Sequence, residues 1–196
     1  VLDVIRDPRW GRVEECISED PYVVGTIGTA YVEGLQSAGV DATLKHFLGY
    51  SASTAGRNHA PVQAGQREIA EVFLPPFEMA IIDGAAASVM NSYAAIDGVP
   101  VASDPKILTE LLREQLEFEG VVVADYFAVA FLRLMQQVAA NNSDAATQAL
   151  TAGIDVELPS ADAYPELVEL VREGALPERY VDRALIRVLN QKEKHG

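Results

Sequence analysis

Short, predominantly apolar runs alternate along this chain with longer amphipathic stretches. The apolar runs have the length of β-strands and cover residues 1–5, 42–47, 86–90, 120–124 and 154–158. In the stretches between them, apolar residues recur at intervals of three and four, the period of a helix with one buried face. These stretches predict helices over residues 21–38, 67–82, 104–118, 129–139, 143–152, 164–174 and 177–192.

Proline and glycine mark several of the predicted boundaries. Pro21 follows Asp20 at the first position of a helix, where its missing N–H costs nothing, and Gly39 ends that helix. Pro75 and Pro76 are expected to kink or divide the helix over 67–82. A loop rich in Ser, Ala, Gly and Asn covers 49–65, and a turn-rich loop with Asp97-Gly98 covers 91–100.

Repeated strand–helix units with predominantly apolar strands predict a parallel sheet covered by helices on both faces. Such an α/β fold is either an open doubly wound sheet or a (β/α)8 TIM-type barrel. Polar residues follow the carboxyl end of each predicted strand, and a barrel gathers all of these ends in one mouth. The chain contains neither Gly-x-Gly-x-x-Gly after a strand nor a Walker A sequence. This pattern favours the barrel.

The predicted barrel is incomplete. A complete one usually needs about 250 residues, whereas this chain has 196 and shows about five strand–helix units. No internal repeat or shift in composition divides it. We therefore expect residues 1–196 to be a single partial barrel domain whose N-terminal strands are absent from the segment.

Composition narrows the functional classes. Hydrophobic residues make up 49% of the chain, as in globular domains, and the net charge of −14 disfavours binding to nucleic acid or to anionic membrane surfaces. No apolar run is long enough to span a bilayer. The single cysteine, Cys16, excludes an internal disulfide and does not specify a compartment. Without His-Glu-x-x-His, Cys-x-x-Cys or Gly-x-Ser-x-Gly, we expect no metal, no cofactor and no serine nucleophile.

Asp125 is the first candidate for chemistry because it directly follows the apolar run 120–124. A carboxylate held on a rigid strand at the rim of the core can act as a nucleophile, a base or a metal ligand. The alternative is that Asp125 caps the helix that follows it.

Lys45-His46 is the second candidate, at the end of the apolar run 42–47. The lysine can form a Schiff base or donate hydrogen bonds to substrate hydroxyls. The histidine can transfer protons, although a lone histidine is more often a structural hydrogen-bond donor.

Further polar and aromatic residues lie in loops near the strand ends. Together, Arg12, Arg57 and Tyr93 can form a pocket wall that reads hydroxyl groups, whereas singly each is more often a surface or capping residue. Trp10 is either a platform for a sugar ring or part of the core. Glu157, at the end of the fifth run, is a possible pocket carboxylate, a solvated rim residue or a partner of Lys45.

Several motifs occur in a recognisable order across nearly the whole chain. They are Asp7-Pro8-Arg9-Trp10-Gly11-Arg12, Lys45-His46-Phe47, Phe73-Leu74-Pro75-Pro76-Phe77, Val89-Met90-Asn91-Ser92-Tyr93, Val123-Ala124-Asp125-Tyr126 and Ala152-Gly153-Ile154-Asp155. In this order the chain resembles glycoside hydrolase family 3, of the β-glucosidase/β-xylosidase type. The resemblance implies a retaining β-glycosidase that hydrolyses terminal non-reducing β-linked sugars of an oligosaccharide or aryl glycoside.

The resemblance also implies a role for individual residues. Asp125 matches the nucleophile that forms a covalent glycosyl-aspartate intermediate, Tyr93 an aromatic residue that positions it, and Met90 a pocket-lining residue. The residues that match hydrogen-bonding partners of the sugar are Arg12, Lys45, His46 and Arg57. Ala124 stands where the family commonly has serine.

The second carboxylate of such an enzyme is missing from the matched motifs. Most of the family carries its general acid/base, a glutamate, on a following α/β sandwich domain, which we expect to be absent from this segment and to complete the site. The β-N-acetylhexosaminidase subfamily instead uses an Asp–His pair in the loop after Lys-His. His59 lies near that position, but Arg57 stands where the aspartate belongs. The isolated segment should therefore be a poor catalyst.

Two alternatives to a glycosidase stay open at this point. A non-catalytic sugar-binding or structural domain could keep the barrel without turnover. A lyase could use Lys45 as a Schiff-base amine, although the adjacent His46 and the arginines suit hydroxyl recognition better.

Overall fold

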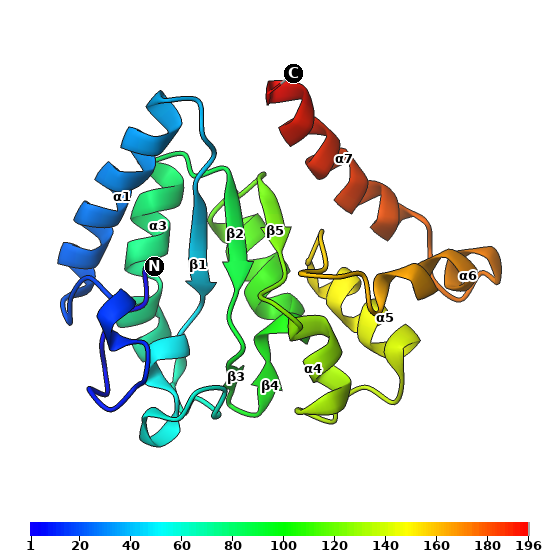
Figure 1. Ribbon diagram of the computed structural model, residues 1–196, viewed down its shortest axis with the longest axis horizontal. Coiled ribbons are helices and arrows are strands. Elements are labelled where there is room, and N and C mark those ends of the chain that lie inside the picture. Colours follow the sequence, from blue (N-terminus) through cyan, green and yellow to red (C-terminus); the bar gives the residue numbers. More distant parts are fainter. Residues whose placement is uncertain (196) are drawn as a thin grey trace. The chain divides into compact units, whose positions relative to one another are not determined.

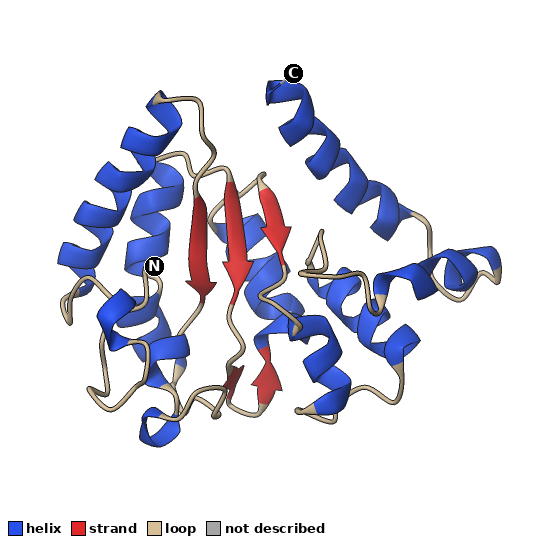
Figure 2. Ribbon diagram, in the orientation of Figure 1, coloured by secondary structure: helices blue, strands red, loops and turns tan. Residues whose placement is uncertain are grey.

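The computed structural model describes residues 1–195, which divide into two compact units, Val1–Val101 and Ala102 onward. Each unit combines helices with strands, as Figures 1 and 2 show. No helix within residues 1–195 has the length and apolar character needed to cross a membrane.

A pair of parallel strands forms the sheet of the first unit. Strand β1 (Thr43–Phe47) pairs with β2 (Ser88–Asn91), with Leu44 opposite Val89 and a register irregularity before Phe47. Helix α1 (Pro21–Ser37) packs against α3 (Pro75–Ile82), and α3 contacts β1 (Figure 1). The strand–helix–strand order confirms the predicted α/β character.

Local signals place the helix boundaries of this unit. The Asp20 carboxylate accepts hydrogen bonds from the backbone N–H groups of Tyr22, at 2.8 Å, and Val23, at 3.3 Å, which caps α1 as the Asp-Pro signal predicts. The second predicted helix is divided before its prolines. It consists of α2 (Gln66–Glu68), a π-helical turn (Ile69–Phe73) and α3, because a proline has no N–H to continue the ladder.

The predicted strand over residues 1–5 does not form. This segment is extended beside β1, and the N–H of Leu2 donates to the carbonyl of Lys45 at 2.7 Å. The N–H of His46, however, donates to the side-chain carboxylate of Asp3, at 3.2 Å, instead of a backbone carbonyl. The Asp3 side chain therefore takes the place of a backbone carbonyl in the strand pairing. Residues 1–5 lie along β1 without forming a strand, and this segment is called the strap below.

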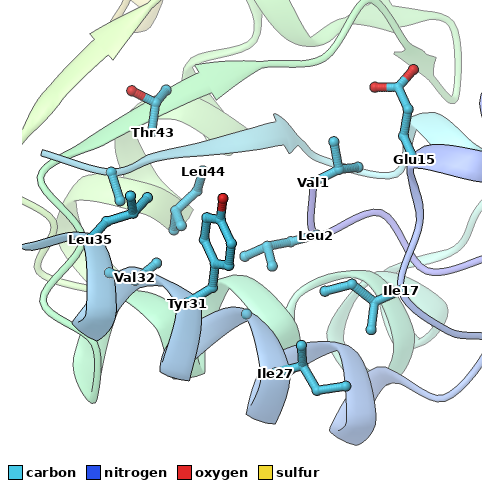
Figure 3. A pocket seen from close by; sticks show the side chains of 12 residues that line it. Val1, Leu2, Glu15, Ile17, Ile27, Tyr31, Val32, Leu35, Thr43 and Leu44 are labelled. Atoms are coloured by element: carbon cyan, nitrogen blue, oxygen red, sulfur yellow. The ribbon is translucent and has the colours of Figure 1, made fainter. Parts of the chain in front are cut away.

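An apolar hollow of about 320 Å³ lies between this strap, α1 and β1. Figure 3 shows Leu2, Tyr31, Leu35 and Leu44 pointing into the same region. None of the sequence-predicted site residues lines it. The hollow is therefore a feature of packing in the first unit, separate from the chemistry considered below.

The loop over 91–100 contains a small hairpin that the sequence pattern did not predict. Strands β3 (Ala95–Ile96) and β4 (Val99–Pro100) pair antiparallel, and both residues between them, Asp97 (φ 49°) and Gly98 (φ 83°), have positive φ. Aspartate followed by glycine favours this kind of turn. Strands of two residues are too short to show an alternating pattern.

The second unit has β5 (Val121–Val123) as its strand. Its helices are the π-helix η6 (Lys106–Gln115), α4 (Ala128–Leu134), α5 (Asn142–Ala152), α6 (Leu167–Arg172) and α7 (Arg179–His195). Helix α5 lies beside α4 and α6 (Figure 1), and α7 contacts both α5 and β5. Except for the last residues of 129–139, these helices lie close to the predicted stretches.

The fifth predicted strand, 154–158, reduces to a single parallel bridge between Val123 and Val156. Two acidic side chains inside the stretch are buried and make hydrogen bonds of their own, which competes with a regular ladder. The carboxylate of Asp155 accepts the N–H of Val122 at 2.8 Å, and Glu157 accepts the N–H of Tyr164 at 2.8 Å. Neither unit by itself closes into a barrel.

Asp155 is also the centre of a buried charge network in this unit. Its Oδ2 accepts a hydrogen bond from Arg113 at 2.7 Å, and its Oδ1 accepts one from Arg187 of α7 at 2.9 Å. Arg113 donates further to the carbonyls of Phe118, at 3.0 Å, and Gly120. Burial lowers the pKa of Arg113 to about 10. The network ties η6 and α7 to the segment around β5.

Candidate functional site

The carboxyl end of β1 carries the Lys45-His46 pair predicted from the sequence. Lys45 is half-buried, and within residues 1–195 no group forms a hydrogen bond or ion pair with its ammonium. His46 is almost completely buried, and its Nδ1 lies 2.8 Å from Oδ2 of Asp3. The lysine can therefore donate to a ligand, whereas the histidine ring is held from one side by a carboxylate.

Tyr50 lies at the centre of an aromatic cluster in the first unit and is fully buried. The rings of Trp10 and His46 each meet it edge-on, with centroids 5.1 Å away, and the ring of Tyr93 does so at 5.6 Å. His59 stacks on Tyr50 at 6.4 Å and contacts Tyr93 at 4.5 Å. The cluster thus joins residues from three distant stretches of sequence.

Trp10 is part of the core and cannot act as a platform for a sugar ring. Only 2% of its surface is exposed, and its ring packs against Tyr50. The alternative that the sequence left open, a core tryptophan, is the one that the structure shows.

Arg12 lies at the edge of this cluster, with its guanidinium carbon 5.6 Å from the centre of the Tyr50 ring. Its Nε and Nη2 donate to the two carboxylate oxygens of Glu15 at 2.5 and 2.8 Å. This hydrogen-bonded pairing raises the pKa of Arg12 and lowers the pKa of Glu15. Both charges are therefore maintained at neutral pH, and Glu15 holds the guanidinium in place.

Two further predicted residues are not gathered into the cluster. Arg57 is exposed and, among residues 1–195, its side chain has no hydrogen bond or ion pair. Met90 is half-buried in β2. The first unit therefore brings together Arg12, His46 and Tyr93, with Lys45 adjacent in β1.

Gly56 allows the 49–65 loop to approach the Arg9–Trp10 backbone closely. A Cβ at this position would lie 2.7 Å from backbone atoms of both Arg9 and Trp10, and the residue has φ +66°. Only glycine satisfies both conditions without displacing the segment that leads to Arg12.

Replacing Gly56 with alanine is expected to destabilise the protein more than the same change at Gly39. Gly39 also has positive φ (+80°), but no atom lies within 4 Å of its virtual Cβ. Gly39→Ala should therefore cost about 1–2 kcal/mol of unfolding free energy from backbone strain alone. Gly56→Ala should cost about 1–3 kcal/mol more because of the clash. Denaturant unfolding of both variants measures this, and equal losses would contradict the close approach.

Asp125 follows β5 in the second unit and is 7% exposed. The N–H groups of Ala124 and Phe127, on either side of it, donate to the carbonyls of Val156 and Leu158, both at 2.8 Å. Its own Oδ1 accepts the N–H of Tyr126 at 2.8 Å. The carboxylate is therefore held on a rigid backbone at the rim of the core.

Asp125 does not cap the following helix, which was the alternative to a functional role. Helix α4 begins at Ala128, its N-cap position is Phe127, and no side chain makes a capping hydrogen bond there. The carboxylate is therefore not used to start the helix.

Glu157 is buried as a loop anchor. Its carboxylate accepts the backbone N–H groups of Ala163, at 3.0 Å, and Tyr164, at 2.8 Å. Burial raises its pKa, against the opposing effect of these hydrogen bonds. Of the two carboxylates singled out near strand ends in this unit, Glu157 has a clear structural task in closing the 157–164 loop.

Sequence reasoning missed three residues that shape the first unit's cluster. Asp3 was hidden as a lone polar residue in an apolar run, although such a residue is itself a signal that a partner exists. Glu15 is three residues after Arg12, which is a recognisable pairing distance. Tyr50 had no signal in the pattern, because its central position depends on long-range packing.

Clusters of metal-ligating side chains and the single thiol can be checked in the part of the chain that the structure describes. Residues 1–195 contain no group of three or more His, Cys, Asp or Glu side chains that could hold a metal ion. Burial raises the pKa of the Cys16 thiol to about 12, so it stays protonated at neutral pH.

Comparison with known proteins identifies the family. The model of the glycosyl hydrolase family 3 N-terminal domain matches residues 1–191, so the chain belongs to this family. A β-xylosidase from Formosa agariphila is 36% identical over all of this chain and 29% of its own length. A lysosomal β-glucosidase from Dictyostelium discoideum is also 36% identical, over 100% of this chain and 26% of its own length.

Solved structures agree with the family assignment. A β-glucosidase from Erythrobacter marinus superimposes with a TM-score of 0.97 and 42% identity, covering 100% of this chain and 27% of that one. A mutant β-glucosidase from Listeria innocua in complex with laminaribiose superimposes with a TM-score of 0.94 and 34% identity. The match covers 99% of this chain and 28% of that one. The chain thus spans less than a third of the length of these relatives.

Proposed function

We propose that this chain is the nucleophile-bearing part of a retaining β-glycosidase of the β-glucosidase/β-xylosidase type. The observation that carries the proposal is Asp125, a nearly buried carboxylate held at the end of β5 and not used as a helix cap, in a chain of glycosyl hydrolase family 3. Relatives named both β-xylosidase and β-glucosidase support the class of substrate.

In the proposed reaction, a carboxylate oxygen of Asp125 attacks the anomeric carbon of the terminal sugar. The glycosidic C–O bond breaks, and the leaving oxygen takes a proton from a general acid. The resulting glycosyl ester is then hydrolysed by water, which gives its proton to the same group now acting as a base, so that the configuration is retained. The transition state is oxocarbenium-like and gains from hydrogen bonds to the ring hydroxyls.

The sugar hydroxyls are bound, in this proposal, by the cationic and polar residues of the first unit. The Lys45 ammonium makes no hydrogen bond or ion pair within residues 1–195 and can donate its protons to a ligand. Arg12 keeps its charge because Glu15 stabilises it. Arg57 is a further donor, His46 offers a ring nitrogen, and Tyr93 and Met90 contribute pocket surface. Hydrogen bonds of this charged kind contribute about 1.5–3 kcal/mol each.

The general acid is proposed to come from outside residues 1–196, on a following α/β sandwich domain. We also propose that further strand–helix units, preceding this segment, complete a (β/α)8 barrel. Relatives more than three times as long support both ideas. The apolar hollow beside β1 and α1 (Figure 3) supports the second, because an additional strand and helix would bury it.

Labelling with a 2-deoxy-2-fluoro-β-glycosyl fluoride, in the glucose and xylose series, tests the proposed function. The fluorine slows hydrolysis of the ester, so a glycosidase accumulates one covalent sugar. In the full-length protein that contains this chain, we expect peptide mass spectrometry to find that sugar on Asp125. Binding without labelling would indicate a non-catalytic sugar-binding domain, and a label on another residue would refute the nucleophile assignment.

A further inference from the structure

Asp3 and His46 form a buried carboxylate–imidazole pair, of which the proposed function uses only His46. Their side chains are 0% and 1% exposed. Oδ2 of Asp3 lies 2.8 Å from Nδ1 of His46 and also accepts the backbone N–H of His46 at 3.2 Å. One carboxylate oxygen therefore contacts both the ring and the backbone of the same residue.

The pair is fixed from both sides. The Asp3 strap is attached to β1 by the bond from the N–H of Leu2 to the carbonyl of Lys45, and the hydroxyl of Ser51 donates to the carbonyl of Val4 at 2.5 Å. The imidazole ring packs on the edge of Tyr50, with centroids 5.1 Å apart. Neither side chain can turn without disturbing this packing.

This contact determines which nitrogen of His46 carries a proton. An ionised carboxylate only accepts hydrogen bonds, so the nitrogen facing it must donate. Nδ1 therefore carries the proton that is donated to Asp3, and Nε2 is the ring nitrogen on the other side of the imidazole. In the neutral ring Nε2 is an acceptor.

We propose that Asp3 is a positioning residue for sugar binding: its carboxylate keeps the proton on Nδ1 of His46 and fixes the ring, so that Nε2 is the atom offered to a sugar hydroxyl. The proposal rests on the proposed function, because it assigns His46 to the sugar. It adds a residue that itself contacts no substrate. Replacing a carboxylate that orients a functional histidine typically costs 10- to 100-fold in metal sites.

Asp3→Asn tests the proposal with almost no change of shape. If the amide NH₂ group faces Nδ1, that nitrogen has to accept, the proton moves to Nε2, and the backbone N–H of His46 loses its acceptor. If the amide oxygen faces Nδ1, the hydrogen bond stays, but the negative charge that strengthens it is lost. In the full-length protein we expect kcat/KM for an aryl β-glycoside to fall about 10- to 100-fold. His46→Ala should cost at least as much, and adding Asp3→Asn to it should cost little more, because Asp3 acts through His46.

The control for lost stability is Val4→Ala, a neighbouring buried residue with no polar side chain. It should lower the melting temperature but leave kcat/KM within about two-fold, because it is not part of the hydrogen-bonded pair. If Asp3→Asn behaves like Val4→Ala, or if its effect adds fully to that of His46→Ala, Asp3 is only structural and the proposal is wrong.

A direct readout is the NMR spectrum of the unmodified protein with ¹⁵N-labelled histidine, in which the His46→Gln variant serves to assign the signals of His46. The expected spectrum has a protonated Nδ1 on His46, and a bare Nδ1 would overturn the proposal even if Asp3→Asn did not fold. The two proposals fail separately. Loss of the fluoro-sugar label on Asp125 bears on the glycosidase function, whereas the state of Nδ1 bears on Asp3 alone.

Discussion

Asp125→Asn in the full-length protein is expected to lower kcat for an aryl β-glycoside by about 10⁴-fold or more, which is the scale seen when a catalytic nucleophile is removed. The amide cannot form the glycosyl ester. Its oxygen can still accept the N–H of Tyr126, so the local structure should persist. Release of nitrophenol from an aryl glycoside measures the loss, and unfolding curves verify that the variant is folded.

Two comparisons sharpen this experiment. Asp20→Asn, at the cap of α1, should leave turnover unchanged, because asparagine caps helices as well as aspartate does. Asp125→Ala makes room for a small external nucleophile, so added azide should restore cleavage and give a glycosyl azide of inverted configuration. Turnover near that of the unmodified protein in Asp125→Asn would refute the assignment.

Asp155→Ala is expected to reduce the unfolding free energy by about 3–5 kcal/mol, the usual cost of removing one partner from a buried ion pair. Arg113 and Arg187 would lose their shared carboxylate, and the N–H of Val122 would lose its acceptor. The side chain of Arg113 is 8% exposed, and its pKa is already lowered by burial. An uncompensated charge there is therefore costly.

Denaturant titration measures this loss, with Asp182→Ala as the control. Asp182 is an exposed aspartate near the start of α7, and its replacement should change stability by only about 0.5 kcal/mol. A loss below about 1 kcal/mol for Asp155→Ala would show that the arginines find other acceptors or water.

Helix boundaries were the most predictable part of the fold because they depend on neighbouring residues. Asp20 and Pro21 begin α1 as expected, and Pro75 begins α3 after a divided helix. The strands were less predictable, since an apolar run indicates burial but not hydrogen-bonding partners. Residues 1–5 form a strap and not a strand, because the Asp3 side chain accepts the backbone N–H of His46 in place of a backbone carbonyl.

The candidate site shows the same division. Lys45, His46 and Asp125 could be selected in the sequence, because a polar residue directly after an apolar strand stands out. The pairing of Asp3 with His46 could not be predicted, because the two residues are 43 positions apart in the chain. The packing of Trp10 on Tyr50 joins residues 40 positions apart and could not be predicted either. Such contacts depend on how the elements pack.

The sequence by itself determined the α/β class, the ends of most helices, the acidic surface and the family resemblance that comparison confirmed. These properties follow from local periodicity, turn residues, composition and ordered motifs. Only the tertiary structure decided that Trp10 is core, that Glu157 anchors a loop and that Asp3 holds His46. The reason is physical: a buried polar group must find a partner, and which partner it finds is decided by packing between segments that are distant in sequence.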